Sequence, residues 1–102
     1  MSIIHANAEN FENEVLKNKK TVILDFYADW CGPCRMLAPV LEKIDAERED
    51  IAIAKVNVDN EPSLAEAFGV TSIPAIFVLK NGEVVNQGVG FMPKEKLIDL
   101  AK

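Results

Sequence analysis

The chain has 102 residues, of which 49% are hydrophobic and 26% charged, and its net charge at pH 7 is −5. This length and balance are typical of one globular domain over residues 1–102. The acidic balance disfavours nucleic acid and anionic membranes as partners, because both bind surfaces that concentrate lysine and arginine.

The N-terminal residues lack the basic start and long apolar core of a secretory signal, so we expect a cytoplasmic protein unless a leader was removed before the first residue. We also expect a monomer. No run approaches the roughly 20 apolar residues of a membrane-spanning helix. Residues 2–6 are predicted to form a short first strand. Asn10 is predicted to cap a short helix, because its side chain can accept a hydrogen bond from a free helical N–H. The apolar side of this helix comprises Phe11, Val15 and Leu16.

Two continuous apolar runs, at residues 21–27 and 51–58, are typical of strands buried on both faces of a parallel sheet. Between them apolar residues recur at helical spacing, which predicts one helix over about residues 32–48. Pro39 falls inside this helix and is expected to bend it. The three elements form a strand-helix-strand unit, which favours a parallel pair with a right-handed crossover.

The C-terminal half begins with a short helix that Pro62 opens and Gly69 ends. Asn81-Gly82 is the strongest short signal for a β-hairpin, and Pro93 opens the last helix. The strands of this hairpin are predicted at residues 75–80 and 83–90. The predicted order is therefore β-α-β-α-β-α-β-β-α, an α/β fold with a mixed sheet and helices on both faces.

Both cysteines lie in the segment DWCGPC, at positions 31 and 34. A Cys-x-x-Cys pair can bind a metal, staple the fold or exchange disulfides. This pair follows a central strand at the start of a helix, where open α/β sheets place their active sites. The free N–H groups and partial positive charge of a helix start favour a thiolate, so Cys31 is predicted to be the nucleophile and Cys34 the resolving cysteine. Gly32 permits the tight turn and Pro33 fixes φ as the helix opens.

The two other interpretations of the cysteine pair are weaker. A closed metal site needs four ligands, whereas the chain offers two cysteines and the distant His5. We expect no metal, although a site shared between two chains stays open. A static disulfide would not persist in a reducing cytosol, and a domain of this size can bury a core without one.

Two charged residues interrupt the apolar strands. Asp25 lies within residues 21–27, and burial there would raise its pKa and make it a proton acceptor near neutrality. Alternatively, its side chain reaches solvent at the strand end. Lys55 interrupts residues 51–58 in the same way, and it either reaches Asp25 or extends to solvent.

Several motifs in order resemble the thioredoxin family: WCGPC preceded by LDFYA, then Pro39, KVNVD, GVTSIPA, KNGEVV and GVG. The resemblance covers nearly the whole chain and implies the thioredoxin fold, with a mixed five-stranded sheet and four helices. It implies that Asp25 accepts the proton of Cys34, with Lys55 as its neighbour. It also implies a cis peptide bond before Pro74. The residues that it places in substrate docking are Trp30, Gly32, Pro33, Ile73, Pro74 and Gly90.

The resemblance further implies a protein disulfide reductase that carries electrons from NADPH, delivered by a separate thioredoxin reductase, to disulfides of target proteins. No bound cofactor is expected beyond the redox-active disulfide Cys31–Cys34. Tyr27 stands where some relatives carry a second tryptophan, and Ala75 and Phe91 also depart from the common pattern. Two other functions stay open: a disulfide oxidase or isomerase, and a non-catalytic subunit of a larger complex.

Overall fold

The protein, described from a computed structural model over residues 3–102, has five strands in one sheet of order β1-β3-β2-β4-β5. Strands β1, β2 and β3 run parallel, and β4 and β5 are antiparallel to their neighbours. The strand bounds are Ile4–His5 (β1), Thr21–Tyr27 (β2), Ile51–Asn57 (β3), Ala75–Lys80 (β4) and Glu83–Val89 (β5). The helices are Glu12–Leu16 (η1), Gly32–Glu47 (α1), Pro62–Ala67 (α2) and Lys94–Leu100 (α3).

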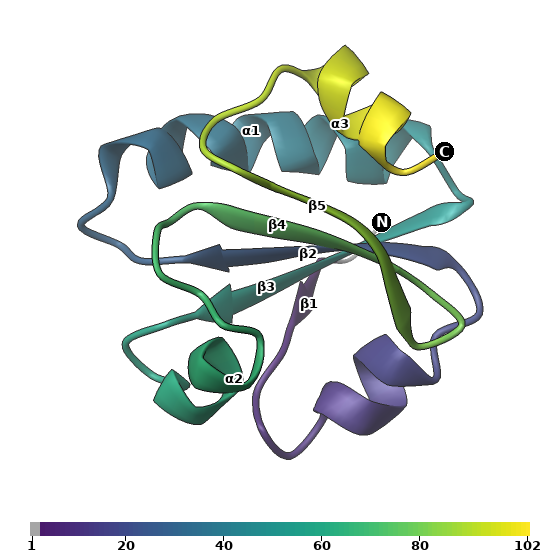
Figure 1. Ribbon diagram of the computed structural model, residues 1–102. Helices are drawn as coiled ribbons and strands as arrows, with labels where there is room; N and C mark the ends of the chain where they lie inside the picture. The colour runs from purple at the N-terminus through teal and green to yellow at the C-terminus, as the bar shows by residue number, and fades with distance from the viewer. Residues whose placement is uncertain (1–2) are drawn as a thin grey trace.

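Helices cover both faces of this sheet (Figure 1). The helices α1 and α3 lie over one face, and α2 and η1 lie over the other. Alternate residues of a strand point to opposite faces, so β2 supplies both cores. Ile23 packs in the core beneath α1 and α3, and Leu24 packs in the core shared with η1 and α2. The predicted mixed five-stranded sheet with four helices, in the predicted order, is confirmed.

The helix and turn signals in the sequence identify most of the element boundaries. α1 continues through Pro39 as one helix, and Pro62 is at the start of α2 as predicted. Gly69 adopts a φ of +67° just after α2. The turn between β4 and β5 has positive φ at both central residues, Asn81 and Gly82, as a tight two-residue hairpin requires.

The prediction for the first helix is wrong in detail. η1 is a single π-type turn, closed by a hydrogen bond from the Lys17 N–H to the Glu12 carbonyl. The Asn10 side chain does not cap η1, because its amide forms hydrogen bonds with residues earlier in the chain. Its oxygen accepts from the Asn7 N–H at 2.8 Å, and its nitrogen donates to the His5 carbonyl at 3.1 Å. The first strand is also shorter than predicted, although residue 2 lies outside the described residues.

Candidate functional site

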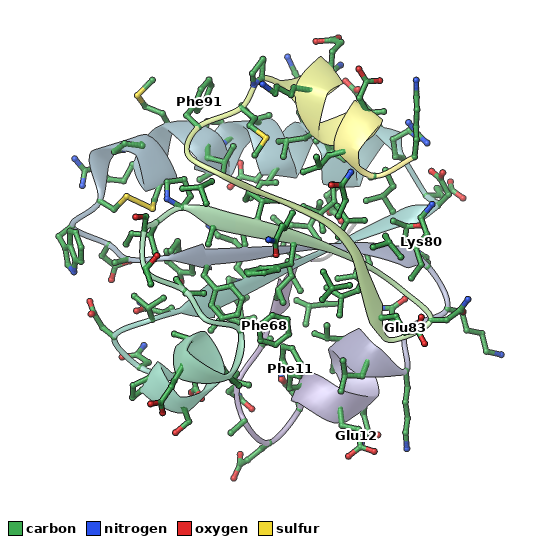
Figure 2. All side chains as sticks on the ribbon, in the orientation of Figure 1. Phe11, Glu12, Phe68, Lys80, Glu83 and Phe91 are labelled. Carbon is green, nitrogen blue, oxygen red and sulfur yellow. A yellow bond between two sulfur atoms is a disulfide. The ribbon has the colours of Figure 1, made fainter. Side chains whose placement is uncertain are left out.

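The cysteine pair lies beyond the carboxyl end of β2, where the chain turns into α1. Cys31 and Cys34 form a disulfide, with their Cα atoms 5.2 Å apart, visible as the yellow bond at the start of α1 in Figure 2. Cys31 is the residue that precedes the first turn of α1, and its Sγ accepts a hydrogen bond from the Cys34 N–H at 3.3 Å. The helix start therefore directs an otherwise free N–H at the sulfur of Cys31.

Both cysteines are almost fully buried in the disulfide form, with exposed fractions of 5% for Cys31 and 3% for Cys34. The exposed fractions of the two cysteines therefore barely differ, whereas their positions relative to the start of α1 do differ. Gly32 and Pro33 form the first helical residues, and a side chain at Gly32 would meet nothing within 4 Å. The loop before the helix is held by Arg35, whose guanidinium donates to the Asp29 carbonyl at 2.9 Å.

A second loop approaches the disulfide from the start of β4. The peptide bond between Ile73 and Pro74 is cis, as the resemblance implies. The Ile73 carbonyl oxygen lies 3.9 Å from the Sγ of Cys31. The Pro74 carbonyl accepts from the Gly90 N–H at 2.8 Å, so this loop is joined to the end of β5. The structure therefore brings the Ile73–Pro74 pair next to Cys31 and joins it to Gly90, although these three segments lie apart in sequence.

Three exposed apolar side chains, here called the apolar rim, lie within two positions in the chain of residues of the site: Trp30, Met36 and Phe91. Trp30 is 68% exposed, and its Nε1 donates to Asp59 Oδ2 at 3.0 Å. Met36 on α1 and Phe91 after β5 are also exposed, and Figure 2 shows Phe91 pointing away from the sheet. Sequence reasoning missed the anchoring role of Asp59, because no local pattern connects it to a tryptophan 29 residues earlier.

Asp25 is the one charged side chain that is fully buried in the described residues, with an exposed fraction of 0%. Neither of its carboxylate oxygens has a hydrogen-bond partner in that part of the chain. Burial raises the pKa of Asp25 from its ordinary 3.8 to about 7, against a smaller lowering by the positive charge of Lys55. The alternative in which Asp25 reaches solvent is therefore excluded.

Lys55 is the register partner of Asp25 on the neighbouring strand β3. Its ammonium nitrogen lies 4.4 Å from the centre of the Tyr27 ring. Both side chains border a hollow of about 280 Å³ that also touches Cys34, and this volume is ample for water. The remaining residues that line it are Ala28, Asp29, Arg35 and Ala38.

Comparisons with known proteins agree with this geometry. The thioredoxin family model matches residues 2–102. The chain belongs to the thioredoxin family. The thioredoxin of Bacillus subtilis (strain 168) is 48% identical over 101 residues, which cover 98% of this chain and 95% of the relative. The thioredoxin of Chlorobaculum thiosulfatiphilum is 46% identical over 93 residues, covering 90% of this chain and 86% of the relative.

Membership of the thioredoxin family and the Cys31–Cys34 disulfide establish a thiol-disulfide oxidoreductase that acts on disulfide-containing substrates. The redox-active group is the cysteine pair itself. Within residues 3–102, no group of three or more His, Cys, Asp or Glu side chains could hold a metal ion. None of the described helices has the length and apolar character needed to cross a membrane.

Proposed function

We propose that this member of the thioredoxin family is a protein disulfide reductase in which Cys31 attacks the substrate and Cys34 resolves the intermediate. The observation that carries the assignment is the hydrogen bond from the Cys34 N–H to the sulfur of Cys31 at the start of α1. In the reduced protein this donor and the positive end of the helix stabilise a thiolate at Cys31. No comparable helix start faces Cys34, which lies one turn further along.

The proposed reaction transfers two electrons to the substrate. The Cys31 thiolate attacks one sulfur of the substrate disulfide, forms a mixed disulfide and displaces the other sulfur as a thiolate that takes up a proton. Cys34 then loses its proton and attacks the sulfur of Cys31. This step closes the Cys31–Cys34 disulfide and releases the second substrate thiol. The substrate is thereby reduced and the protein oxidised.

We assign the proton of Cys34 to Asp25. A carboxylate with a pKa of about 7 is matched to proton transfer near neutral pH. The support for a connection is the hollow that Cys34 lines together with Lys55, the register partner of Asp25, because this hollow has room for water. Lys55 is assigned the role of an electrostatic neighbour that favours the ionised form of Asp25.

Docking of the substrate is assigned to the apolar rim and the loop that faces it. Trp30, Gly32 and Pro33 provide the surface on one side of the disulfide. On the other side, Ile73 and Pro74 present backbone next to Cys31, and Gly90 supports that loop through its N–H. An extended substrate segment can hydrogen-bond to such exposed backbone as an added strand does.

We further propose that the 102 residues act as one domain and a monomer in the cytoplasm, where protein thiols are kept reduced. The electrons come from NADPH through a separate thioredoxin reductase, which docks on the same rim. No cofactor other than the cysteine pair takes part.

The Cys34→Ser variant tests the assignment. It retains the nucleophile but cannot resolve the mixed disulfide, so it should trap disulfide-containing proteins as covalent adducts that dithiothreitol releases. The matched Cys31→Ser variant should trap none, because Cys34 does not lie at a helix start that would stabilise its thiolate. Adducts on Cys31→Ser and none on Cys34→Ser would reverse the two roles. Non-reducing electrophoresis with mass spectrometry of the linked cysteine reads out both variants.

A further inference from the structure

Tyr27 and Lys55 form a cation–π pair at the edge of the proton-accepting site. Tyr27 lies two residues after Asp25 in β2 and so points to the same face of the sheet. Lys55 lies beside Asp25 on β3 and extends its ammonium to within 4.4 Å of the Tyr27 ring centre. This distance is well inside the roughly 6 Å over which an aromatic ring attracts a cation.

The ring is the contact that restrains Lys55. In residues 3–102, the Lys55 ammonium takes part in no hydrogen bond or ion pair, and the residue is half-buried. A long lysine side chain in a strand otherwise carries its charged end into water. Without the Tyr27 ring, the Lys55 ammonium would therefore have no contact that keeps it close to Asp25.

We propose that Tyr27 is a positioning residue for disulfide exchange: its ring holds the Lys55 ammonium beside Asp25, and the fixed cation controls how readily Asp25 takes up and releases a proton. The inference rests on the proposed role of Asp25 as proton acceptor. It assigns to this chain a function for a tyrosine that packs against the cysteine cluster but takes no part in the exchange of disulfide bonds.

Other charged groups near the pair do not fill the same role. Tyr27 and Lys55 lie between two hollows, whose other titratable or charged side chains are His5, Asp29, Cys34, Arg35 and Glu61. The Arg35 guanidinium is turned to the Asp29 carbonyl, and the Glu61 carboxylate accepts from the Ala8 N–H. The register partner of Asp25 on β4 is the uncharged Ile76. Lys55 is the charge that lowers the pKa of Asp25 against its burial.

The direct test follows the titration of the Asp25 side-chain carboxyl by carbon-13 NMR in the oxidised protein. Tyr27→Leu frees the ammonium, so the midpoint should rise by about half a pH unit. Tyr27→Phe keeps an aromatic face over Lys55 and should titrate like the wild type. Lys55→Met removes the charge and should raise the midpoint at least as much as Tyr27→Leu.

A double-variant cycle distinguishes a Tyr27 ring that positions Lys55 from a ring that only shields Asp25 from water. If Tyr27 acts through Lys55, Tyr27→Leu should add no shift in the Lys55→Met background. An equal shift in both backgrounds would mean that the ring only excludes water, and it would overturn the proposal. The Lys55 methylene protons give an independent measurement that needs no variant. The ring should displace their signals upfield in the wild type, and signals at ordinary positions would also overturn the proposal.

Turnover distinguishes failure of this inference from failure of the proposed function. The titrations need no activity, so an absent coupling between Tyr27 and Lys55 refutes the positioning role alone. Unchanged turnover of Asp25→Asn between pH 6 and pH 9 would refute the role of Asp25 as proton acceptor, and the positioning role with it. If Tyr27 positions Lys55 and Asp25 accepts the proton, the pH profile of disulfide reduction should move to higher pH in Tyr27→Leu and stay in place in Tyr27→Phe.

Discussion

Asp25 combines complete burial with two unpartnered carboxylate oxygens, an arrangement that is unfavourable for stability. The fold tolerates the group because it can hold a proton: its pKa of about 7 leaves a neutral acid over the acidic range. The folded state binds this proton more tightly than the unfolded chain does, where the pKa is near 3.8. The contribution of Asp25 to stability is therefore fully present below about pH 4 and is lost as the pH rises through 7.

The Asp25→Asn variant should accordingly stabilise the oxidised protein above pH 7, by about 1–4 kcal/mol, because it removes a buried charge. The gain should shrink as the pH falls from 7 and disappear below about pH 4, where the wild-type carboxyl is neutral in both states. Urea unfolding at several pH values measures the difference. A gain that is constant with pH would show that the charge of Asp25 is not its cause.

The same variant should slow disulfide reduction near neutral pH, by about 10- to 100-fold if proton transfer from Cys34 limits the reaction. Steady-state reduction of a protein disulfide, with dithiothreitol as electron donor, measures this rate. Full activity in Asp25→Asn would contradict the assignment of the Cys34 proton to Asp25.

At the scale of elements, the start of α1 gives the two cysteines different chemical environments, although they are buried to nearly the same extent. Cys31 precedes the first turn and its sulfur accepts a hydrogen bond from the N–H of Cys34, whereas Cys34 lies inside the helix.

The hairpin between β4 and β5 is a second element whose local geometry requires a particular residue, the glycine at position 82. Gly82 has a φ of +80°, and a side-chain carbon there would lie 2.8 Å from the Leu16 carbonyl oxygen.

In the reduced protein, Cys31 should be alkylated before Cys34, because Cys31 lies at the start of α1. Iodoacetamide at mildly acidic to neutral pH, followed by peptide mapping, measures the order. Cys31 should react with an apparent pKa below the roughly 8.5 of a free cysteine. Faster modification of Cys34 would contradict the effect assigned to the helix start.

Gly82→Ala should destabilise the fold more than Gly69→Ala does. Both positions have positive φ, which is unfavourable for alanine by about 1–2 kcal/mol. A side chain at Gly69 meets nothing within 4 Å, whereas the one at Gly82 meets backbone of η1. The unfolding free energies of the two variants measure the difference. Equal losses would mean that the hairpin does not pack against the end of η1 as described.

For the molecule as a whole, the predictions from sequence succeeded where a residue acts locally. The apolar runs identified β2 and β3 because a strand covered on both faces has no polar side. Pro62, Gly69 and Asn81-Gly82 marked boundaries through their own backbone preferences. Contacts between distant segments were not predictable in this way. The pairing of Lys55 with Tyr27 depends on side-chain positions that only the packed sheet determines. For the cis bond at Pro74, only the family resemblance gave a reason.

The disulfide is not what holds this molecule together. It joins residues three apart in sequence, so it constrains the unfolded chain little, while the two cores on either side of the sheet are formed by other residues. Reduction should leave the far-ultraviolet circular dichroism native and raise the fluorescence of Trp30, which is bonded directly to Cys31. Loss of the spectrum on reduction would identify a structural staple instead.

The measurement that tests the central claim most directly is the equilibrium redox potential of the Cys31–Cys34 pair. Trp30 fluorescence and free-thiol counting should be followed in dithiothreitol and glutathione buffers of known composition, and both signals should share one midpoint. A protein disulfide reductase should give a strongly reducing value, about −270 mV as the thioredoxin family shows. A midpoint between about −120 and −180 mV, the range of disulfide oxidases and isomerases, would contradict the proposed direction of electron flow.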